Sequence, residues 1–398
     1  MKFPFVLILL LIPVLWLIPA CNDEPSSLGV EILESDFVIV KTLDSQVDTV
    51  EQISSFFKRV VPLGASDWIL IGKNNSSTQN LTSSSLLKFI FGFADSLKED
   101  IRLDSINVLD SWIILTNKYE FGDSLAPMNF TVHKVNSNWS SNTFTVDDLP
   151  SLQYDMENVS SEFSATDTLY TFHLDENLVF SWMKNSVDTS LATNYGIYLD
   201  PTIESNKIIG FQAFTPVSSQ AAKLFVVIEK PGFYVDTING FIISDISAVA
   251  GTEPVLPAGL ICTQSSVTMN SKLKFEVGGV LPVGLVINKA QLILTEDTLN
   301  SVFGSSYSNS LRVYSLSSND SIKTQGNPIT MSYKSNQYTA DITTFVRSWV
   351  STGNNYGMLI QSGNQILGTE LFALKGSSEA DTTQRPRIII TYTVKKNL

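Results

Sequence analysis

The sequence predicts an all-β protein with two tandem domains behind an N-terminal export signal, and three observations predict it. Val, Ile, Phe, Tyr, Thr and Ser dominate the 398 residues, and Gly, Pro, Asn and Asp punctuate them, which is typical of strands and turns. Only segments 177–183 and 343–350 show one-turn helical spacing. Four motifs recur in the same order: Leu87-Lys88-Phe89 as Leu273-Lys274-Phe275, Phe121-Gly122-Asp123-Ser124 as Phe303-Gly304-Ser305-Ser306, Ser181-Trp182 as Ser348-Trp349, and Asn194-Tyr195-Gly196 as Asn355-Tyr356-Gly357.

The spacing of these motifs indicates two copies of a whole domain, because solenoid repeats run only to about 50 residues. We expect a first domain over 36–230 and a second over 231–398, with the seam at Pro231-Gly232. Short strands separated by turn residues are typical of a sandwich or barrel. The first copy has longer loops, and loops 137–166 and 183–193 are either candidate ligand-binding segments or neutral insertions.

The first twenty residues predict secretion. Lys2 precedes an apolar stretch over 3–18, and Pro19-Ala20-Cys21 follows it. This order is that of a signal peptide over 1–20, and the stretch lacks the charged stop of a spanning helix. Cys21 at this position resembles a bacterial lipobox, which implies that it becomes a lipid-modified N-terminus. The alternative is an ordinary signal peptide with an incidental cysteine.

A lipidated Cys21 would anchor the protein to a membrane without crossing it, because each buried methylene adds about 0.8 kcal/mol of membrane affinity. Residues 21–35 are polar and would form the tether. Asp23-Glu24 resemble the surface-export signals of some Gram-negative lipoproteins. We therefore expect a protein of the cell envelope, anchored in the outer membrane and exposed to the medium; otherwise the two acids are part of a solvated tether.

Charge and cysteine content narrow the function further. The formal net charge is -13, with no basic stripe, so binding to nucleic acid is not expected. With Cys21 acylated, Cys262 has no partner for an intramolecular disulfide. We expect Cys262 to be a small buried apolar residue rather than a reactive thiol.

The second copy resembles the bacterial DNRLRE domain. Its matching segments, in order, are Leu273-Lys274-Phe275, Leu281-Pro282-Val283-Gly284, Ile287 to Leu294, Asp341-Ile342-Thr343 with Val346 and Trp349, Asn355-Tyr356-Gly357, and Arg385-Pro386-Arg387-Ile388. The resemblance covers 255–393 and, more weakly, 65–230. It implies tandem jelly-roll β-sandwiches like carbohydrate-binding modules, and some family members bind acidic polysaccharide.

The first copy departs from this pattern. His173 stands where the second copy has Asp341, and Ala221-Ala222 replace Arg385-Pro386. The turn at 281–284 is replaced by 95–103. A shared fold is therefore better supported than a shared ligand specificity.

Three tryptophans are the candidate ligand-binding residues. Alternation along 290–295, transferred to the first copy, places Trp112 opposite Gln291 on the outer face of its strand. Trp68 and Trp139 are the other candidates for exposed aromatics. Such rings can stack on sugars, or they can be covered by a loop or by the other domain. Trp182 and Trp349, which occupy the same place in both copies, are expected to be core anchors.

No enzyme is predicted. His133 and His173 are the only histidines, neither stands in a metal-ligand spacing, and no nucleophile elbow or phosphate loop occurs. No cofactor is expected; structural calcium has no supporting motif, and no metal ligand can be named. Two functions remain: a surface lipoprotein that binds polysaccharide, or a structural or adhesive envelope lipoprotein that docks protein partners. Exposure of Trp112, Trp68 and Trp139 distinguishes the two.

Overall fold

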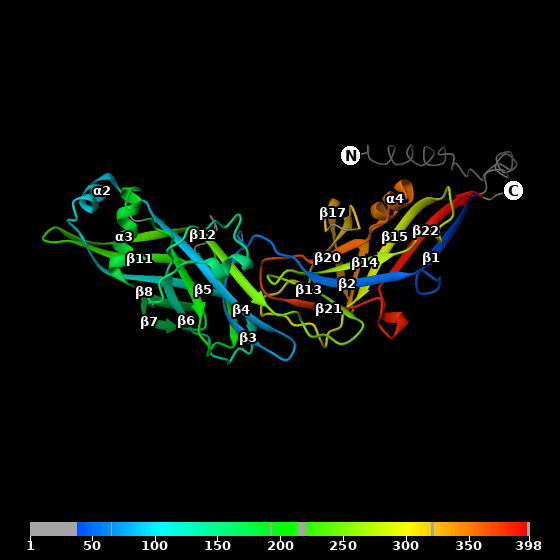
Figure 1. Ribbon diagram of the computed structural model, residues 1–398, viewed down its shortest axis with the longest axis horizontal. Coiled ribbons are helices and arrows are strands. Elements are labelled where there is room, and N and C mark those ends of the chain that lie inside the picture. The colour runs from blue at the N-terminus through cyan, green and yellow to red at the C-terminus, as the bar shows by residue number, and fades with distance from the viewer. Residues whose placement is uncertain (1–37, 65, 192, 214–219, 320–321, 396–398) are drawn as a thin grey trace, which may run out of the picture.

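The computed structural model describes residues 38–395, apart from 65, 192, 214–219 and 320–321 (Figure 1). The expected signal peptide 1–20, the tether 21–35 and Cys21 lie outside these residues. The described chain is all-β and antiparallel, and it forms two lobes side by side along the long axis (Figure 1). No helix in the described part is long and apolar enough to span a bilayer.

The N-terminal lobe comprises residues 68–251. Its strands are β3 (Trp68–Asn75), β4 (Asn80–Phe91), β5 (Asn107–Gly122), β6 (Phe130–Lys134), β7 (Ser160–Ala165), β8 (Leu169–Leu174), β9 (Ile197–Pro201), β10 (Lys207–Gln212), β11 (Lys223–Lys230) and β12 (Tyr234–Gly251). Strand β10 pairs with both β3 and β5, so the pairings β10-β3-β4-β12-β11-β5 form a closed circuit around one core.

The C-terminal lobe comprises residues 38–58 and 260–395. Its strands are β1 (Val38–Asp44), β2 (Gln52–Lys58), β13 (Leu260–Gln264), β14 (Met269–Phe275), β15 (Val286–Thr295), β16 (Leu311–Leu316), β17 (Thr324–Thr330), β18 (Ser332–Lys334), β19 (Gln337–Asp341), β20 (Met358–Ser362), β21 (Leu371–Lys375) and β22 (Arg387–Lys395). They form one sheet in the order β1-β22-β15-β19-β18 and a second that runs β17-β16-β20-β14-β13-β21, with β2 also on β14.

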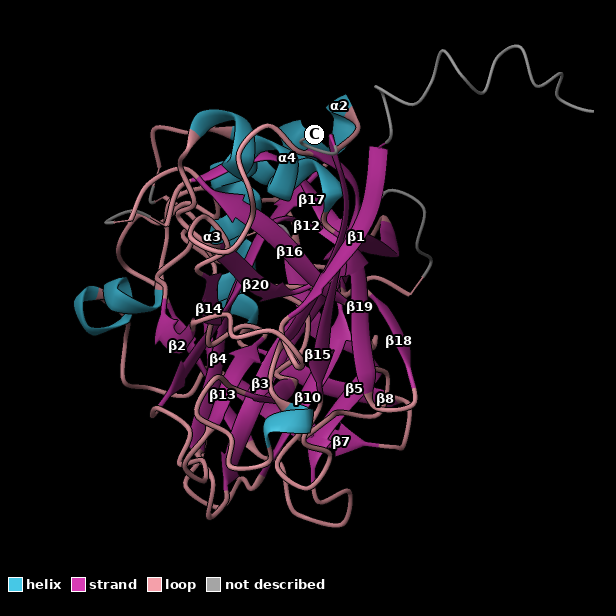
Figure 2. Cartoon of the chain, turned by 90° about the vertical axis from the view of Figure 1, so that its right-hand side faces the viewer, coloured by secondary structure: helices cyan, strands magenta, loops and turns pink. Residues whose placement is uncertain are grey.

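Helices are few and short: α2 (Asp95–Arg102), α3 (Glu176–Val187), α4 (Thr343–Thr352), η3 (Val146–Ser151) and η4 (Thr382–Gln384). The Asp175 carboxylate caps α3 by accepting a hydrogen bond from Leu178 N, and Gly353, with φ +71°, ends α4 in the left-handed conformation. Helices α3 and α4 confirm the two expected helical segments. Figures 1 and 2 show α2, α3 and α4 on the same side of the molecule.

The strand pairings of the two lobes repeat. In the N-terminal lobe β4 pairs with β3 and β9, and β5 pairs with β8 and β11. In the C-terminal lobe β14 pairs with β13 and β20, and β15 pairs with β19 and β22. Helix α3 lies between β8 and β9, as α4 does between β19 and β20. The Leu-Lys-Phe strands, the Ser-Trp helices and the Asn-Tyr-Gly turns therefore occupy equivalent places in the two lobes. Phe121-Gly122 and Phe303-Gly304 do not, because the first ends β5 and the second lies in the loop after β15.

The strands that complete the sheets come from different parts of the chain in the two lobes. In the N-terminal lobe the single strand β12 pairs first with β11 and then with β4. In the C-terminal lobe β1 pairs with β22 and β2 pairs with β14, so two strands from the start of the chain fill the place of β12. The sheets therefore divide the chain differently from the expected ranges 36–230 and 231–398: 38–58 belongs to the second lobe, and 234–251 belongs to the first.

Repeated asparagines hold the repeated motifs together. Asn194 Nδ2 donates to the Phe89 carbonyl at 2.8 Å, and its Oδ1 accepts from Gly196 N at 2.8 Å. Asn355 does the same with Phe275 at 2.6 Å and Gly357 at 3.0 Å. Each glycine has a positive φ beside the facing strand, where a side chain would collide. The same structural requirement therefore explains why Asn-Tyr-Gly occurs in both turns.

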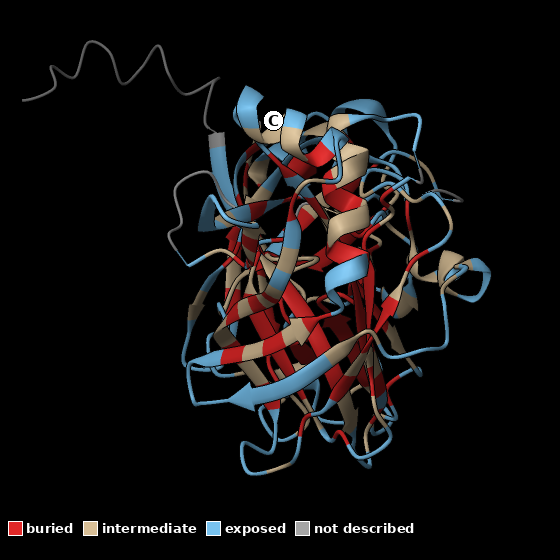
Figure 3. Ribbon diagram, turned by 90° about the vertical axis from the view of Figure 1, so that its left-hand side faces the viewer, coloured by how far each residue is buried: buried red, intermediate tan, exposed pale blue. Residues whose placement is uncertain are grey.

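Each lobe has its own apolar core. Figure 3, an end-on view, shows buried strands within an exposed rim. Trp182 and Trp349 are each 3% exposed, as expected of core anchors. Cys262 is fully buried, and burial raises the pKa of its thiol to about 12, so it is the apolar residue expected and not a reactive thiolate.

A third core joins the lobes. It contains Tyr119 and Phe121 from β5 together with Met269 and Leu371 from the C-terminal lobe. The Tyr119 hydroxyl accepts a hydrogen bond from Thr369 N at 2.9 Å. Because this contact is apolar and also carries buried hydrogen bonds, the lobes form one continuous unit.

Candidate functional site

Trp112 lies on the outer face of the N-terminal lobe, where alternation along its strand placed it. Its neighbours Ser111 and Ile113 are fully buried, whereas Trp112 is half-buried. In register, Trp112 lies between Phe225 of β11 and His173 of β8. The Trp112 and Phe225 rings stack, with centroids 5.4 Å apart and planes at 11°. We call these three residues, with Asn239 opposite Phe225 on β12, the Trp112 face.

Charged groups border the Trp112 face. His173 Nδ1 lies 2.7 Å from an Asp110 carboxylate oxygen, and His173 Nε2 lies 3.6 Å from Glu162. The carboxylate of Asp110 fixes the orientation of the imidazole ring beside the indole. The face therefore combines a rigid aromatic surface with hydrogen-bonding groups at its rim.

Exposed apolar side chains extend the Trp112 face. Phe241 of β12 is 53% exposed and lies opposite Ile90 of β4, which is 43% exposed. A cluster of large apolar side chains that is open to solvent is more typical of a binding surface than of an ordinary solvent-facing sheet.

The C-terminal lobe has no such face at the equivalent place. Gln291 of β15 lies between Ile389 of β22 and Asp341 of β19, as Trp112 lies between Phe225 and His173. The expected equivalence of Trp112 with Gln291 agrees with this register. Asp44, in the position of Asn239, is held by an ion pair with Arg387 that keeps the pKa of its carboxyl below the usual range.

Trp68, the second candidate, lies against the core between the lobes. Its ring stacks on Tyr119, with centroids 4.7 Å apart. It packs with the residues that join the lobes, among them Met269 and Leu371. The structure therefore places Trp68 in an interface inside the molecule and not beside Trp112.

Trp139, the third candidate, is half-buried against its own lobe. It packs on a small core that contains Phe144 and Tyr198, and its indole Nε1 donates to the Tyr195 carbonyl at 2.8 Å. The three tryptophans thus form no common row, and Trp112 alone lies on an outer sheet face.

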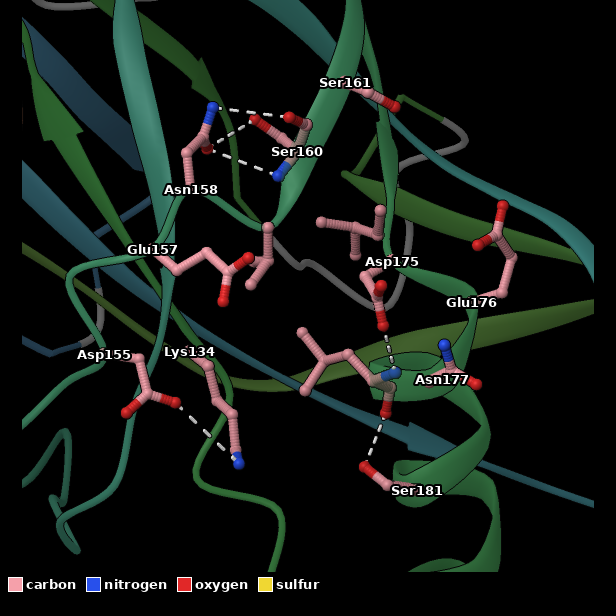
Figure 4. A pocket seen from close by; sticks show the side chains of 13 residues that line it. Lys134, Asp155, Glu157, Asn158, Ser160, Ser161, Asp175, Glu176, Asn177 and Ser181 are labelled. Carbon is pink, nitrogen blue, oxygen red and sulfur yellow. Dashed lines mark hydrogen bonds and ion pairs between the residues drawn. The ribbon is translucent and has the colours of Figure 1, made fainter.

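An open cavity of about 520 Å³ lies beside the first turn of α3; we call it the N-lobe cavity (Figure 4). Figure 4 shows Glu157, the Lys134–Asp155 pair and Asp175 around the opening. Lys134 Nζ lies 3.9 Å from Asp155. The floor is apolar, and the lining residues are Lys134, Asp155, Glu157, Asn158, Val159, Ser160, Ser161, Leu174, Asp175, Glu176, Asn177, Leu178 and Ser181.

The wall of the N-lobe cavity is held by fixed side chains. Asn158 Oδ1 accepts from Val132 N at 2.9 Å, which ties the loop to β6. His133 is 6% exposed, and its Nδ1 lies 3.0 Å from the Asp155 carbonyl oxygen, which can only accept. The buried His133 therefore supports the segment 155–158.

Sequence reasoning named no residue of this cavity as a binding residue, although Ser181 belongs to a repeated motif. Loop 137–166 was a candidate ligand-binding segment, and it supplies Asp155 and residues 157–161 of the lining. No motif signals the cavity, because its residues come together only when β6, β8 and α3 pack. The length of the loop was the one available signal.

Within the described chain, no three His, Cys, Asp or Glu side chains are arranged to hold a metal ion. A scan against known protein-family models finds no match, and a search of curated proteins finds no relative.

Proposed function

We propose that this chain is a lipoprotein of the bacterial outer membrane, anchored through Cys21 and exposed to the medium, with two tandem jelly-roll β-sandwiches that are non-catalytic. The N-terminal lobe binds carbohydrate on the Trp112 face. The repeated strand pairings and the resemblance of 255–393 to the DNRLRE domain support the tandem arrangement.

The stacked Trp112–Phe225 pair is the observation that carries the carbohydrate proposal. A sugar ring has an apolar C–H face that stacks on an aromatic ring, and its hydroxyl groups need polar partners at the edge. His173, Asp110 and Asn239 supply such partners around the indole. Because Trp112 is already packed against Phe225, little side-chain entropy is lost when a ligand binds.

A glycan array probed with the detergent-solubilised full chain tests this proposal. We expect binding to a subset of polysaccharides and a loss of about tenfold or more for Trp112→Gln, because buried aromatic anchors contribute about 2 kcal/mol or more. Gln291→Ala, at the equivalent place in the other lobe, is the matched control and should leave binding unchanged. Absence of binding to every neutral and uronic-acid polymer would refute it.

The anchor is tested separately. Cys21→Ser should move the protein from the membrane fraction to the soluble fraction, because the anchor is the acylated cysteine. Continued sedimentation of the variant with the membranes would contradict lipid anchoring at Cys21.

A docking function is the second candidate, and the core that joins the lobes favours it. Tyr119 and its partners join the two lobes through a shared buried core, as a spacer within an envelope assembly would need. The exposed Phe241 and Ile90 would then contact a protein partner. Binding of polysaccharide that depends on Trp112 would exclude docking as the main role of that face.

A further inference from the structure

The C-terminal lobe has an open cavity that matches the N-lobe cavity in size. This C-lobe cavity also has a volume of about 520 Å³. It lies between the edge strand β17 and the first turn of α4, and its lining residues are Ser315, Gln325, Gly326, Asn327, Pro328, Ile329, Thr344, Phe345 and Ser348.

The two cavities occupy equivalent places. Lys134 at the end of β6 pairs with Ile197, which directly follows Gly196. Ser315 of β16 pairs with Met358, which directly follows Gly357. Lys134 and Ser315, the strand residues that line the two cavities, therefore occupy equivalent positions.

The helices complete the equivalence. Ser181 and Ser348, each before the buried tryptophan of its helix, line the N-lobe and C-lobe cavities respectively. One turn earlier, Leu178 and Phe345 give each cavity an apolar floor. The segment that closes each cavity comes from the polypeptide after the equivalent strand, 155–161 in one lobe and 325–329 in the other.

The two linings differ in charge. Four carboxylates and one ammonium group line the N-lobe cavity. Lys134 and Asp155 pair with each other, and Asp175 is engaged by the helix end. Glu157 and Glu176 remain exposed at the opening. The C-lobe cavity has no charged residue in its lining and presents amide and hydroxyl groups over Phe345, Ile329 and Pro328.

We propose that the two cavities are a duplicated pair of saccharide sites whose ligands have diverged: the N-lobe cavity takes a saccharide with an ammonium group, and the C-lobe cavity takes an uncharged one. Their volume lies in the range of small-molecule sites, about 300–1,000 Å³. Excess carboxylate attracts a cation and penalises an anion, whereas an uncharged polar rim over an apolar floor suits a neutral polyol.

These sites do not include Trp112 or Phe225, so the inference goes beyond the carbohydrate proposal for that face. Glycan binding that does not depend on Trp112 would contradict the carbohydrate proposal for that face and would not contradict the proposal for the cavities. Binding at the cavities is therefore measured in variants that keep Trp112.

The experiment compares two probes with the same backbone, a glucosamine oligosaccharide and its N-acetylated counterpart. Calorimetric titration of the full chain in detergent should show binding of both. The double variant Glu157→Gln/Glu176→Gln should weaken binding of the glucosamine oligomer about tenfold and leave the acetylated oligomer unaffected. The control Glu51→Gln/Asp236→Asn makes the same charge change on exposed residues outside the cavity.

The C-lobe cavity is tested by filling it. Thr344→Trp, at an exposed lining position, should abolish binding of the acetylated oligomer at this site. Val350→Trp on the same helix lies outside the lining and is the matched control. Both substitutions are on the surface, and circular dichroism verifies the fold. Failure of both oligomers to bind, or equal effects of the variants and their controls, would overturn the proposal.

Discussion

Asp245 should make the stability of this protein depend on pH. It lies on β12 opposite Leu87 and is partly buried, with Asp67 as its charged neighbour. Burial first, and then repulsion by Asp67, raises the pKa of Asp245 from 3.8 to about 7. The perturbation is Asp245→Asn, which keeps the shape and removes the charge.

The sign and the magnitude follow from the difference in pKa. The folded state holds the Asp245 proton more tightly than the unfolded state does. Protonated Asp245 therefore contributes stability that is fully present below about pH 4 and is lost as the pH rises through about 7. A pKa displaced from 3.8 to about 7 corresponds to about 4 kcal/mol at high pH. We expect Asp245→Asn to raise the free energy of unfolding by roughly 2 kcal/mol at pH 5 and about 4 kcal/mol at pH 9.

Urea unfolding of the parent and the variant at pH 5, 7 and 9 measures this difference. Asp236→Asn, an exposed position on the same strand, is the control and should change little at any pH. A stabilisation by Asp245→Asn that does not grow between pH 5 and pH 9, or one matched by Asp236→Asn, would refute the reasoning.

Two further predictions concern the packing. Asn194→Ala and Asn355→Ala should each lower the free energy of unfolding by about 1–3 kcal/mol, because each leaves a backbone carbonyl of the facing strand unpaired; equal stability of either variant to the parent in urea would contradict the repeated role. Gly304→Ala should cost about 1–3 kcal/mol, because its Cβ would lie 2.1 Å from the Tyr119 ring, whereas Gly278→Ala, which faces open space, should be near neutral in the same measurement.

The repeat and the core could be predicted from the sequence because they depend on local patterns. Alternation along 290–295, carried to β5, put Trp112 on an outer face, and the structure places it there. The two helical segments and the buried Trp182 and Trp349 were readable for the same reason. Helix α2 was missed, since its polar sequence resembles a loop.

The pairing partners of the strands could not be predicted from the sequence. The apolar run 37–40 predicts a strand, but nothing in its pattern distinguishes β22, the observed partner of β1, from a neighbour in the first lobe. Trp68 and Trp139 look exposed beside polar neighbours, and only the packing of Tyr119 and of the small core around Phe144 covers them. The cavities share this property, because each forms where three separate segments meet.

The pairing of Val38 with Lys395 brings the two ends of the described chain into adjacent strands. A short linker could join them, and a new start between β2 and β3 would then give a circular permutant in which each lobe is one uninterrupted stretch of polypeptide. In that permutant 38–58 would follow β22, as β12 follows β11. The order of the described strands therefore differs from a simple head-to-tail duplication only in that β1 and β2 precede the N-terminal lobe instead of following β22.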